Sequence, residues 1–200
     1  MTEHYYTNKP STSSEQRKWS FVLRGQQFKF ITDNGVFSKS EVDFGSRLLI
    51  DTFVTPDVEG RILDIGCGYG PLGLAIAKCE TSRLIEMVDV NERAIELSKL
   101  NAGANDVRNV HVYSSDRFEN VKEQEFAAIL SNPPIRAGKK VVHDILEKSY
   151  QYLASLGELW IVIQKKQGAP SAIEKLNTVF PYVEVVAKKK GYFIIKAKKD

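Results

Sequence analysis

The chain has 200 residues, of which 42% are hydrophobic and 26% are charged, so its length and composition suit one globular domain with a sizeable core. No run of about 18 apolar residues predicts a membrane span, and the first residues lack a signal-peptide pattern. Two cysteines and three scattered histidines are too few for a disulfide framework or a zinc site, so we expect a cytoplasmic protein without a metal. The net charge of +3 is mildly basic, which suits either a solvated surface or a weak phosphate-contacting one.

The first 35 residues predict a small unit ahead of the main fold. Residues 1–16 are polar and predict a loosely ordered arm. Residues 17–35 predict a β-hairpin with strands at 19–24 and 27–32, because Phe28 and Phe30 alternate with polar residues.

Strands alternate with helices from residue 42 to residue 198, which predicts an α/β fold with a parallel sheet. Asn91 and Ser171 suit the N-caps of two of these helices. No repeat or further boundary is visible, so we expect residues 1–200 to form a single domain whose core is 42–198. The predicted strands are 60–65, 84–88, 109–113, 126–130, 158–163, 182–187 and 192–197, and the predicted helices are 41–53, 71–78, 92–100, 141–154 and 171–180.

A glycine-rich turn, LDIGCGYGPLG at residues 63–73, joins the first predicted strand of the core to a helix. Glycine tolerates positive φ and has no Cβ, so a ligand can lie directly on this backbone and take the free N–H groups of the helix start. The spacing Gly68-x-Gly70-x-x-Gly73, with Asp89 about 20 residues later, formally matches a dinucleotide fingerprint. However, Asp64 at the end of the strand would repel a pyrophosphate and attract a cationic ligand.

Polar residues also follow the next strands of the predicted sheet. In open parallel sheets, ligands bind beyond the carboxyl ends of the strands, so we expect these side chains to share one site. The four residues at successive strand ends are Asp64, Asp89, Asp116 and Asn132.

Two of these acids suit a nucleoside. Asp89 can accept hydrogen bonds from both hydroxyls of a ribose, although it could instead cap the next helix, a role that Asn91 also suits. Asp116 can accept from an adenine amino group, with Arg117 or Phe118 beside the ring, or it can belong to an ordinary polar loop.

Asn132-Pro133-Pro134 is the second strong motif. Two prolines fix φ twice and remove two N–H donors, which leaves rigid carbonyl acceptors beside the Asn132 side chain. Such acceptors suit an N–H₂ group, because their hydrogen bonds orient the nitrogen lone pair and favour the positive charge that develops on it. The alternative is an ordinary Asn-Pro turn.

The glycine turn resembles motif I of class I S-adenosylmethionine methyltransferases, and residues 20–198 resemble the methyltransferase small domain family. The segment SNPPIRAGK at 131–139 is similar to the Asn-Pro-Pro-aromatic loop of that family, and TDNGVFS at 32–38 is similar to its stretch ahead of the cofactor site. The resemblance implies a Rossmann-like seven-stranded sheet with one antiparallel strand and helices on both faces, and S-adenosylmethionine as cofactor. It also implies that Asn132, Pro133 and Pro134 hold an exocyclic amine, most closely the N2 of guanine in 16S ribosomal RNA.

The residues expected to hold the cofactor and the substrate follow from the motifs and the resemblance together. Ile135 stands where the family has an aromatic that stacks on the base, so Phe37 or Tyr69 would have to replace it. The expected cofactor-binding residues are Asp64, Gly66, Cys67, Gly68, Gly70, Asp89, Val90, Asp116, Arg117 and Asn132, and the expected substrate-binding residues are Ile135 and Phe37.

Four other functions fit part of the sequence. The same Asn-Pro-Pro motif occurs in protein glutamine and DNA adenine N-methyltransferases. An NAD-dependent oxidoreductase would explain the glycine spacing but neither Asp64 nor the proline loop. A non-catalytic RNA-binding module would not need all four strand-end residues. RNA, possibly within a ribosomal subunit, is the expected partner, and nothing in the sequence indicates an oligomeric state.

Overall fold

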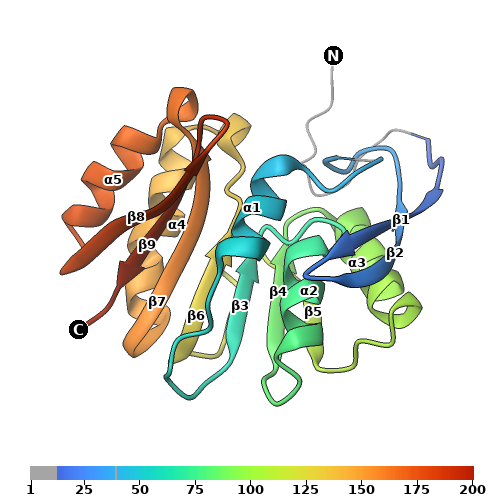
Figure 1. Cartoon of the computed structure of the whole chain (residues 1–200), viewed down its shortest axis with the longest axis horizontal. Coiled ribbons are helices and arrows are strands. Elements are labelled where there is room, and N and C mark those ends of the chain that lie inside the picture. The colour runs from blue at the N-terminus through green and yellow to red at the C-terminus, as the bar shows by residue number, and fades with distance from the viewer. Residues whose placement is uncertain (1–12, 39) are drawn as a thin grey trace.

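The structure is a computed structural model that describes residues 13–38 and 40–200. It contains a seven-stranded sheet in the order β5-β4-β3-β6-β7-β9-β8 and a separate two-stranded sheet, β1-β2 (Figure 1). The elements are β1 (Arg17–Leu23), β2 (Gln26–Thr32), α1 (Phe44–Thr52), β3 (Ile62–Ile65), α2 (Pro71–Cys79), β4 (Ile85–Asp89), α3 (Glu92–Ala104), β5 (Val110–Ser114), β6 (Phe126–Ser131), η1 (Ile135–Ala137), α4 (Lys139–Tyr152), β7 (Leu153–Gln164), η2 (Lys165–Gln167), α5 (Ala169–Asn177), β8 (Tyr182–Lys189) and β9 (Tyr192–Lys198).

The large sheet has the predicted topology. Strands β3 to β7 pair in parallel, whereas β9 is antiparallel to both of its neighbours, β7 and β8. Among the described residues, β9 is therefore the one antiparallel strand of this sheet. This arrangement confirms the Rossmann-like seven-stranded fold with its closing antiparallel strand.

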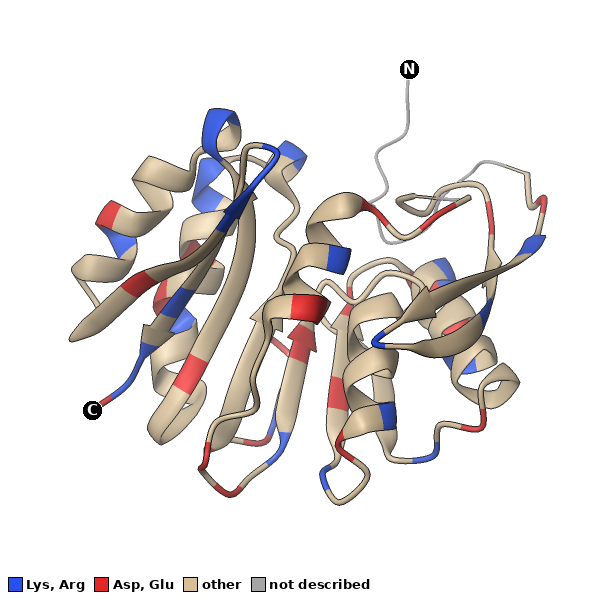
Figure 2. Cartoon of the chain, viewed as in Figure 1, with Lys and Arg blue, Asp and Glu red and all other residues tan. Residues whose placement is uncertain are grey.

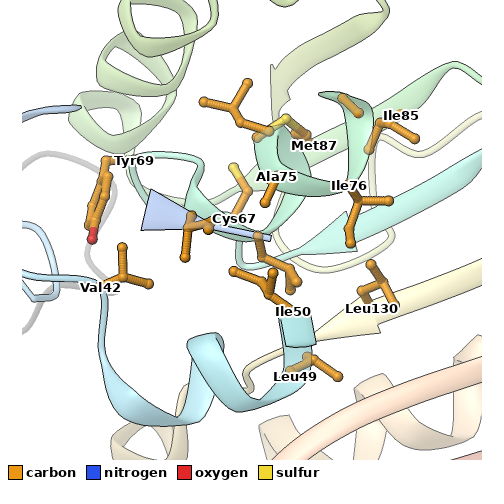
Figure 3. Packing of buried hydrophobic residues seen from close by; sticks show 14 of the residues in the cluster. Val42, Leu49, Ile50, Cys67, Tyr69, Ala75, Ile76, Ile85, Met87 and Leu130 are labelled. Carbon is orange, nitrogen blue, oxygen red and sulfur yellow. The ribbon is translucent and has the colours of Figure 1, made fainter. Parts of the chain in front are cut away.

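Side chains on the two faces of the sheet form two hydrophobic cores. Successive strand residues point to opposite faces, so Ile62 packs with helices α1, α2 and α3, whereas Leu63 packs with α4 and α5. Figure 3 shows the first core, in which Leu49 and Ile50 of α1 lie near Ile76 of α2 and Leu130 of β6. Helices thus cover both faces of the sheet. No helix among the described residues has the length and apolar character needed to cross a membrane.

The predicted hairpin, β1-β2, packs against α3. Phe28 and Phe30 belong to the same core cluster as α2 and α3. Asn101 accepts a hydrogen bond from the Ile31 N–H at 2.7 Å and donates to the Ile31 carbonyl at 3.0 Å, and Asn105 does the same for Lys29 at 2.8 and 2.7 Å. Two asparagine side chains therefore take the place of a neighbouring strand along the edge of β2.

Several predicted boundaries shift in the structure. The first core helix begins at Phe44 rather than at residue 41, because Asp43 caps it. The predicted helix at 141–154 spans Lys139–Tyr152, and the next strand begins at Leu153, where it already pairs with Phe126. The last helix follows Gly168, so Ser171 is not its N-cap.

The predicted arm lies partly outside the described residues, because the description begins at residue 13. The hydroxyl of Ser14 and the N–H of Glu15 both donate to the Asp33 carboxylate at 2.6 Å. Ser14 and Glu15, in the described part of the predicted arm, are therefore bound to the residue that follows the hairpin.

Candidate active site

The parallel pairing brings the predicted strand-end residues to one edge of the sheet. Ile65 of β3 pairs with Val88 of β4 and with Ser131 of β6, so these three strands end level with one another. Asp89 in turn pairs with Ser114 at the end of β5. The residues that follow each strand therefore gather at the carboxyl edge.

The glycine turn between β3 and α2 has an open side and a packed side. Gly66, Gly68 and Gly70 have φ values of 77°, 56° and 98°, in the left-handed region that favours glycine. A Cβ at Gly66 or Gly68 would meet no atom within 4 Å, whereas a Cβ at Gly70 would lie 2.5 Å from the Ser98 hydroxyl. The turn thus leaves room for a ligand above its first two glycines.

Several N–H groups of this turn, which we expected to be free for a ligand, are bound inside the protein. Gly68 donates to Asp89 Oδ2 and Gly73 to Asp64 Oδ2, both at 2.9 Å. Two further N–H groups of the turn donate to the carbonyl of Val88. A pyrophosphate would therefore find occupied donors and two carboxylates, which disfavours the dinucleotide alternative.

Asp64 is a buried acid with one unused oxygen. Its side chain is 1% exposed, and Oδ1 has no hydrogen-bond partner among the described residues. Burial, together with the nearby charge of Asp89, raises the pKa of Asp64 to about 7, although the hydrogen bond from Gly73 opposes the rise. A cationic ligand at this edge would favour the charged form of Asp64.

Asp89 ends β4 and faces the turn. Besides Gly68, its carboxylate accepts the N–H of Asn91 at 2.9 Å, across the partly buried Val90. Asn91 caps α3 by accepting from the N–H groups of its first turn, which confirms the predicted cap and leaves Asp89 free of that role. Burial raises the pKa of Asp89. Each carboxylate oxygen retains a second lone pair for a hydroxyl donor.

Asp116 follows β5 and forms a two-point ion pair with Arg117. The Nε and Nη2 atoms of Arg117 lie 2.8 and 3.1 Å from the two Asp116 oxygens, and Nη1 lies 2.6 Å from Asp144. The hydrogen bonds from Arg117 lower the pKa of Asp116, which stays an acceptor. Phe118 is 3% exposed and stacks on Tyr152, so it lies in the core and not beside a ligand.

The amide of Asn132 is held in one orientation. Its Nδ2 donates to Asp43 Oδ2 at 3.2 Å and to Ser46 Oγ at 3.0 Å. The opposite atom, Oδ1, has no hydrogen-bond partner among the described residues and is left for a donor from a ligand. Asp43 and Ser46 were missed in the sequence, although an aspartate directly before a helical pattern is an N-cap signal.

The other predicted residues fall into buried and exposed groups. Pro133 is buried, and Pro134 precedes η1, in which Ile135 is partly buried. Phe37 is 47% exposed, whereas Tyr69 is 3% exposed and packs against the ring of Phe30. Tyr69 is therefore a core residue and not a stacking partner for a base. Phe37, which is exposed, remains the candidate for stacking on the target base.

Cys67 is the one cysteine in the turn. Its side chain is 4% exposed and lies among the residues of the first core (Figure 3). Burial raises the pKa of the thiol well above its usual range, so the thiolate form needed by a nucleophile is disfavoured. Among the described residues, no group of three histidine, cysteine, aspartate or glutamate side chains could hold a metal.

Comparisons with known proteins agree with this geometry. The model of the methyltransferase small domain family matches residues 27–196. YbxB of Bacillus subtilis, whose name states no activity, is 65% identical over the full length of both chains. The ribosomal RNA small subunit methyltransferase C of Vibrio cholerae is 36% identical over 187 residues, which are 92% of this chain and 53% of that protein. The chain thus spans about half the length of this second relative.

Solved structures share the fold. The Thermus thermophilus 16S rRNA N2 G1207 methyltransferase, in complex with AdoMet and guanosine, has a TM-score of 0.83 and 25% identity, over 96% of this chain and 52% of that one. A Pyrococcus furiosus methyltransferase matches with a TM-score of 0.64 and 21% identity, over 76% of this chain and 80% of that one. This second likeness concerns the fold alone.

Proposed function

Because the chain belongs to the methyltransferase small domain family and S-adenosylmethionine is its cofactor, we propose that it methylates the exocyclic N2 of a guanine in small-subunit ribosomal RNA. The names of the V. cholerae and T. thermophilus relatives support this substrate. The observation that carries the proposal is the Asn132 amide, whose nitrogen is bound by Asp43 and Ser46 while its oxygen is available at the carboxyl edge.

The residues at the carboxyl edge fit the cofactor. The open side of Gly66 and Gly68 leaves space for its methionine part, and the unpartnered oxygen of Asp64 favours a cation nearby. Asp89 is proposed to accept from the ribose hydroxyls and Asp116 from the adenine amine. When bound, S-adenosylmethionine supplies a methyl group on a positively charged sulfur.

The Asn132 loop is proposed to hold the amine that receives the methyl group. Asn132 Oδ1 and the backbone carbonyl of Pro133 would accept its two N–H groups and so orient the nitrogen lone pair. The same acceptors stabilise the positive charge that develops on this nitrogen as the new bond forms. The resulting ammonium is acidic and loses a proton to solvent, so no strong base is needed.

The test is nucleoside mass spectrometry of ribosomal RNA after incubation with the purified protein and isotopically labelled S-adenosylmethionine. The RNA comes from cells that lack the gene, both as naked RNA and within small subunits. We expect labelled N2-methylguanosine from one of these substrates. Parallel incubations contain a protein extract or DNA from the same cells, and labelled glutamine or N6-methyladenine there, without N2-methylguanosine in the RNA, would overturn the proposal in favour of another amine.

The role of Asn132 in methyl transfer can be distinguished from a role in cofactor binding with one variant. Asn132→Ala removes the amide acceptor, and we expect it to lose most of the activity while it binds S-adenosylhomocysteine with nearly unchanged affinity by calorimetry. Unchanged turnover in Asn132→Ala would refute the role assigned to Asn132.

A further inference from the structure

Basic residues gather at the carboxyl ends of β6, β7 and β8, near the segment that follows β6 (Figure 2). They come from three segments that are distant in sequence: the start of α4 with the loop before it, η2, and the tip of the β8-β9 hairpin. All eight side chains are exposed. We call this set the basic surface; it consists of Arg136, Lys139, Lys140, Lys165, Lys166 and Lys188–Lys190.

Contacts between these segments make the surface continuous. The Lys165 N–H donates to the Gly191 carbonyl at 2.8 Å, which joins η2 to the hairpin tip. Lys190 Nζ lies 5.0 Å from the centre of the Phe44 ring, next in sequence to the Asp43 that binds Asn132. The hairpin tip is therefore joined through α1 to the proposed substrate loop.

A small pocket joins the remaining segment. It has a volume of about 120 Å³ and is lined by residues of η1, α4, η2 and α5, among them Ile135, Lys139 and Gln167. Because Ile135 follows directly on the proline motif, the start of α4 and η2 flank the same loop that holds Asn132. The basic surface thus surrounds one side of the proposed substrate site.

The charge of this surface is not neutralised within the protein. Residues 131–141, 164–171 and 186–192 contain no aspartate or glutamate, and none of the eight side chains forms an ion pair with a described residue. Lys148 and Lys196, by contrast, pair with acids. Toward the site, Glu41 and Asp43 precede α1, and Asp43 is already bound to Asn132.

We propose that the basic surface binds the phosphate backbone of the RNA that flanks the target base, an inference that rests on the proposed function. Eight like charges repel one another, and a polyanion relieves that repulsion and releases its own counterions on binding. Lysine suits phosphate as a point charge and carries no base preference. The surface therefore supplies affinity and position, and leaves base selection to the Asn132 loop.

The test measures RNA binding against salt concentration. The variant Lys165→Gln/Lys166→Gln/Lys189→Gln removes three exposed charges that form no ion pair with a described residue. The control variant Lys29→Gln/Lys99→Gln/Lys122→Gln removes three exposed charges elsewhere. The probe is a fluorescent RNA stem-loop with guanines in its loop, followed by anisotropy. We expect the first variant to bind on the order of tenfold or more weakly near 0.1 M salt, with a slope of log K against log salt reduced by about 2.

The outcomes separate this inference from the proposed function. Equal binding and equal slope in the wild type and the first variant would overturn the inference, as would an equal loss in both triple variants. Binding of S-adenosylhomocysteine, measured on the same samples, should be unchanged in both variants. If the protein methylates no RNA and yet shows the expected salt slopes, the proposed function fails while the RNA-binding surface stands.

Discussion

Asp43 and Asn132 are 89 positions apart in the sequence, and the Asn132 amide donates a hydrogen bond to the Asp43 carboxylate at 3.2 Å. Asp43 also caps α1 by accepting the N–H of Ser46 at 3.1 Å. One carboxylate therefore fixes both the start of a helix and the orientation of the side chain proposed to hold the acceptor nitrogen. Because the amide nitrogen is bound on this side, the amide oxygen is left for the substrate.

Asp43→Ala should lower turnover because the Asn132 side chain loses its fixed orientation, and it should leave cofactor binding unchanged. We expect kcat to fall on the order of tenfold to a hundredfold, since small misplacements of a positioning group cost this much, with an unchanged Kd for S-adenosylhomocysteine. Loss of the cap should also lower the free energy of unfolding by about 1 kcal/mol. Asp43→Asn keeps an acceptor oxygen and should restore part of the activity. Asp51→Ala, at an exposed position of the same helix, is the control, and an equal loss there would contradict the positioning role.

Asp89→Ala should weaken cofactor binding. The proposed ribose contact is lost together with the hydrogen bond from Gly68, so we expect S-adenosylhomocysteine to bind at least tenfold more weakly by calorimetry. Asp57→Ala changes an exposed acid away from the site and should bind normally. Equal affinities for the wild type and Asp89→Ala would remove Asp89 from the cofactor site.

Asp64 should make the stability of the free protein fall as pH rises. Burial raises its pKa from 3.8 to about 7, so the folded state holds this proton more tightly than the unfolded state does. The stability that the proton provides is complete below about pH 4 and is lost as pH rises through 7, a change on the order of 4 kcal/mol.

The measurement is urea unfolding from pH 4 to pH 8 for the wild type and Asp64→Asn. Asp89 also has a raised pKa and contributes with the same sign, so the difference between the two proteins isolates Asp64. The stability of Asp64→Asn relative to the wild type should increase with pH. A difference that is constant across this range would show that Asp64 titrates normally.

Asn101→Ala should destabilise the contact between the hairpin and α3. Asn101 is fully buried and bonds to both backbone groups of Ile31 and, at 2.8 Å, to the carbonyl of Tyr69. Its removal leaves buried polar groups without partners, so we expect the free energy of unfolding to fall by about 2–4 kcal/mol in urea. The neighbouring Lys99→Ala changes an exposed side chain and should cost less than about 0.5 kcal/mol. Similar decreases in the free energy of unfolding for the two variants would show that the hydrogen bonds of Asn101 do not stabilise the fold.

Local patterns along the chain predicted the order of strands and helices, the glycine turn and the four strand-end residues. These features depend on local periodicity and on the conformational limits of glycine and proline, which are readable along the chain. The parallel topology then required Asp64, Asp89 and Asn132 to share one edge. The fold settled which groups remain available there, because the N–H of Gly68 is bound by Asp89, 21 positions away, and the Asn132 amide by Asp43, 89 positions away.

Packing also decided which residues are buried and where charges meet. Tyr69 became a core residue because the rings of the hairpin cover it, and the helix before β7 ends at Tyr152 because Leu153 already pairs with β6. The basic segments at 136–140, 165–166 and 188–190 are unremarkable runs in the sequence. They form one surface only because the order β6-β7-β9-β8 sets their strand ends side by side, a relationship that no local pattern encodes.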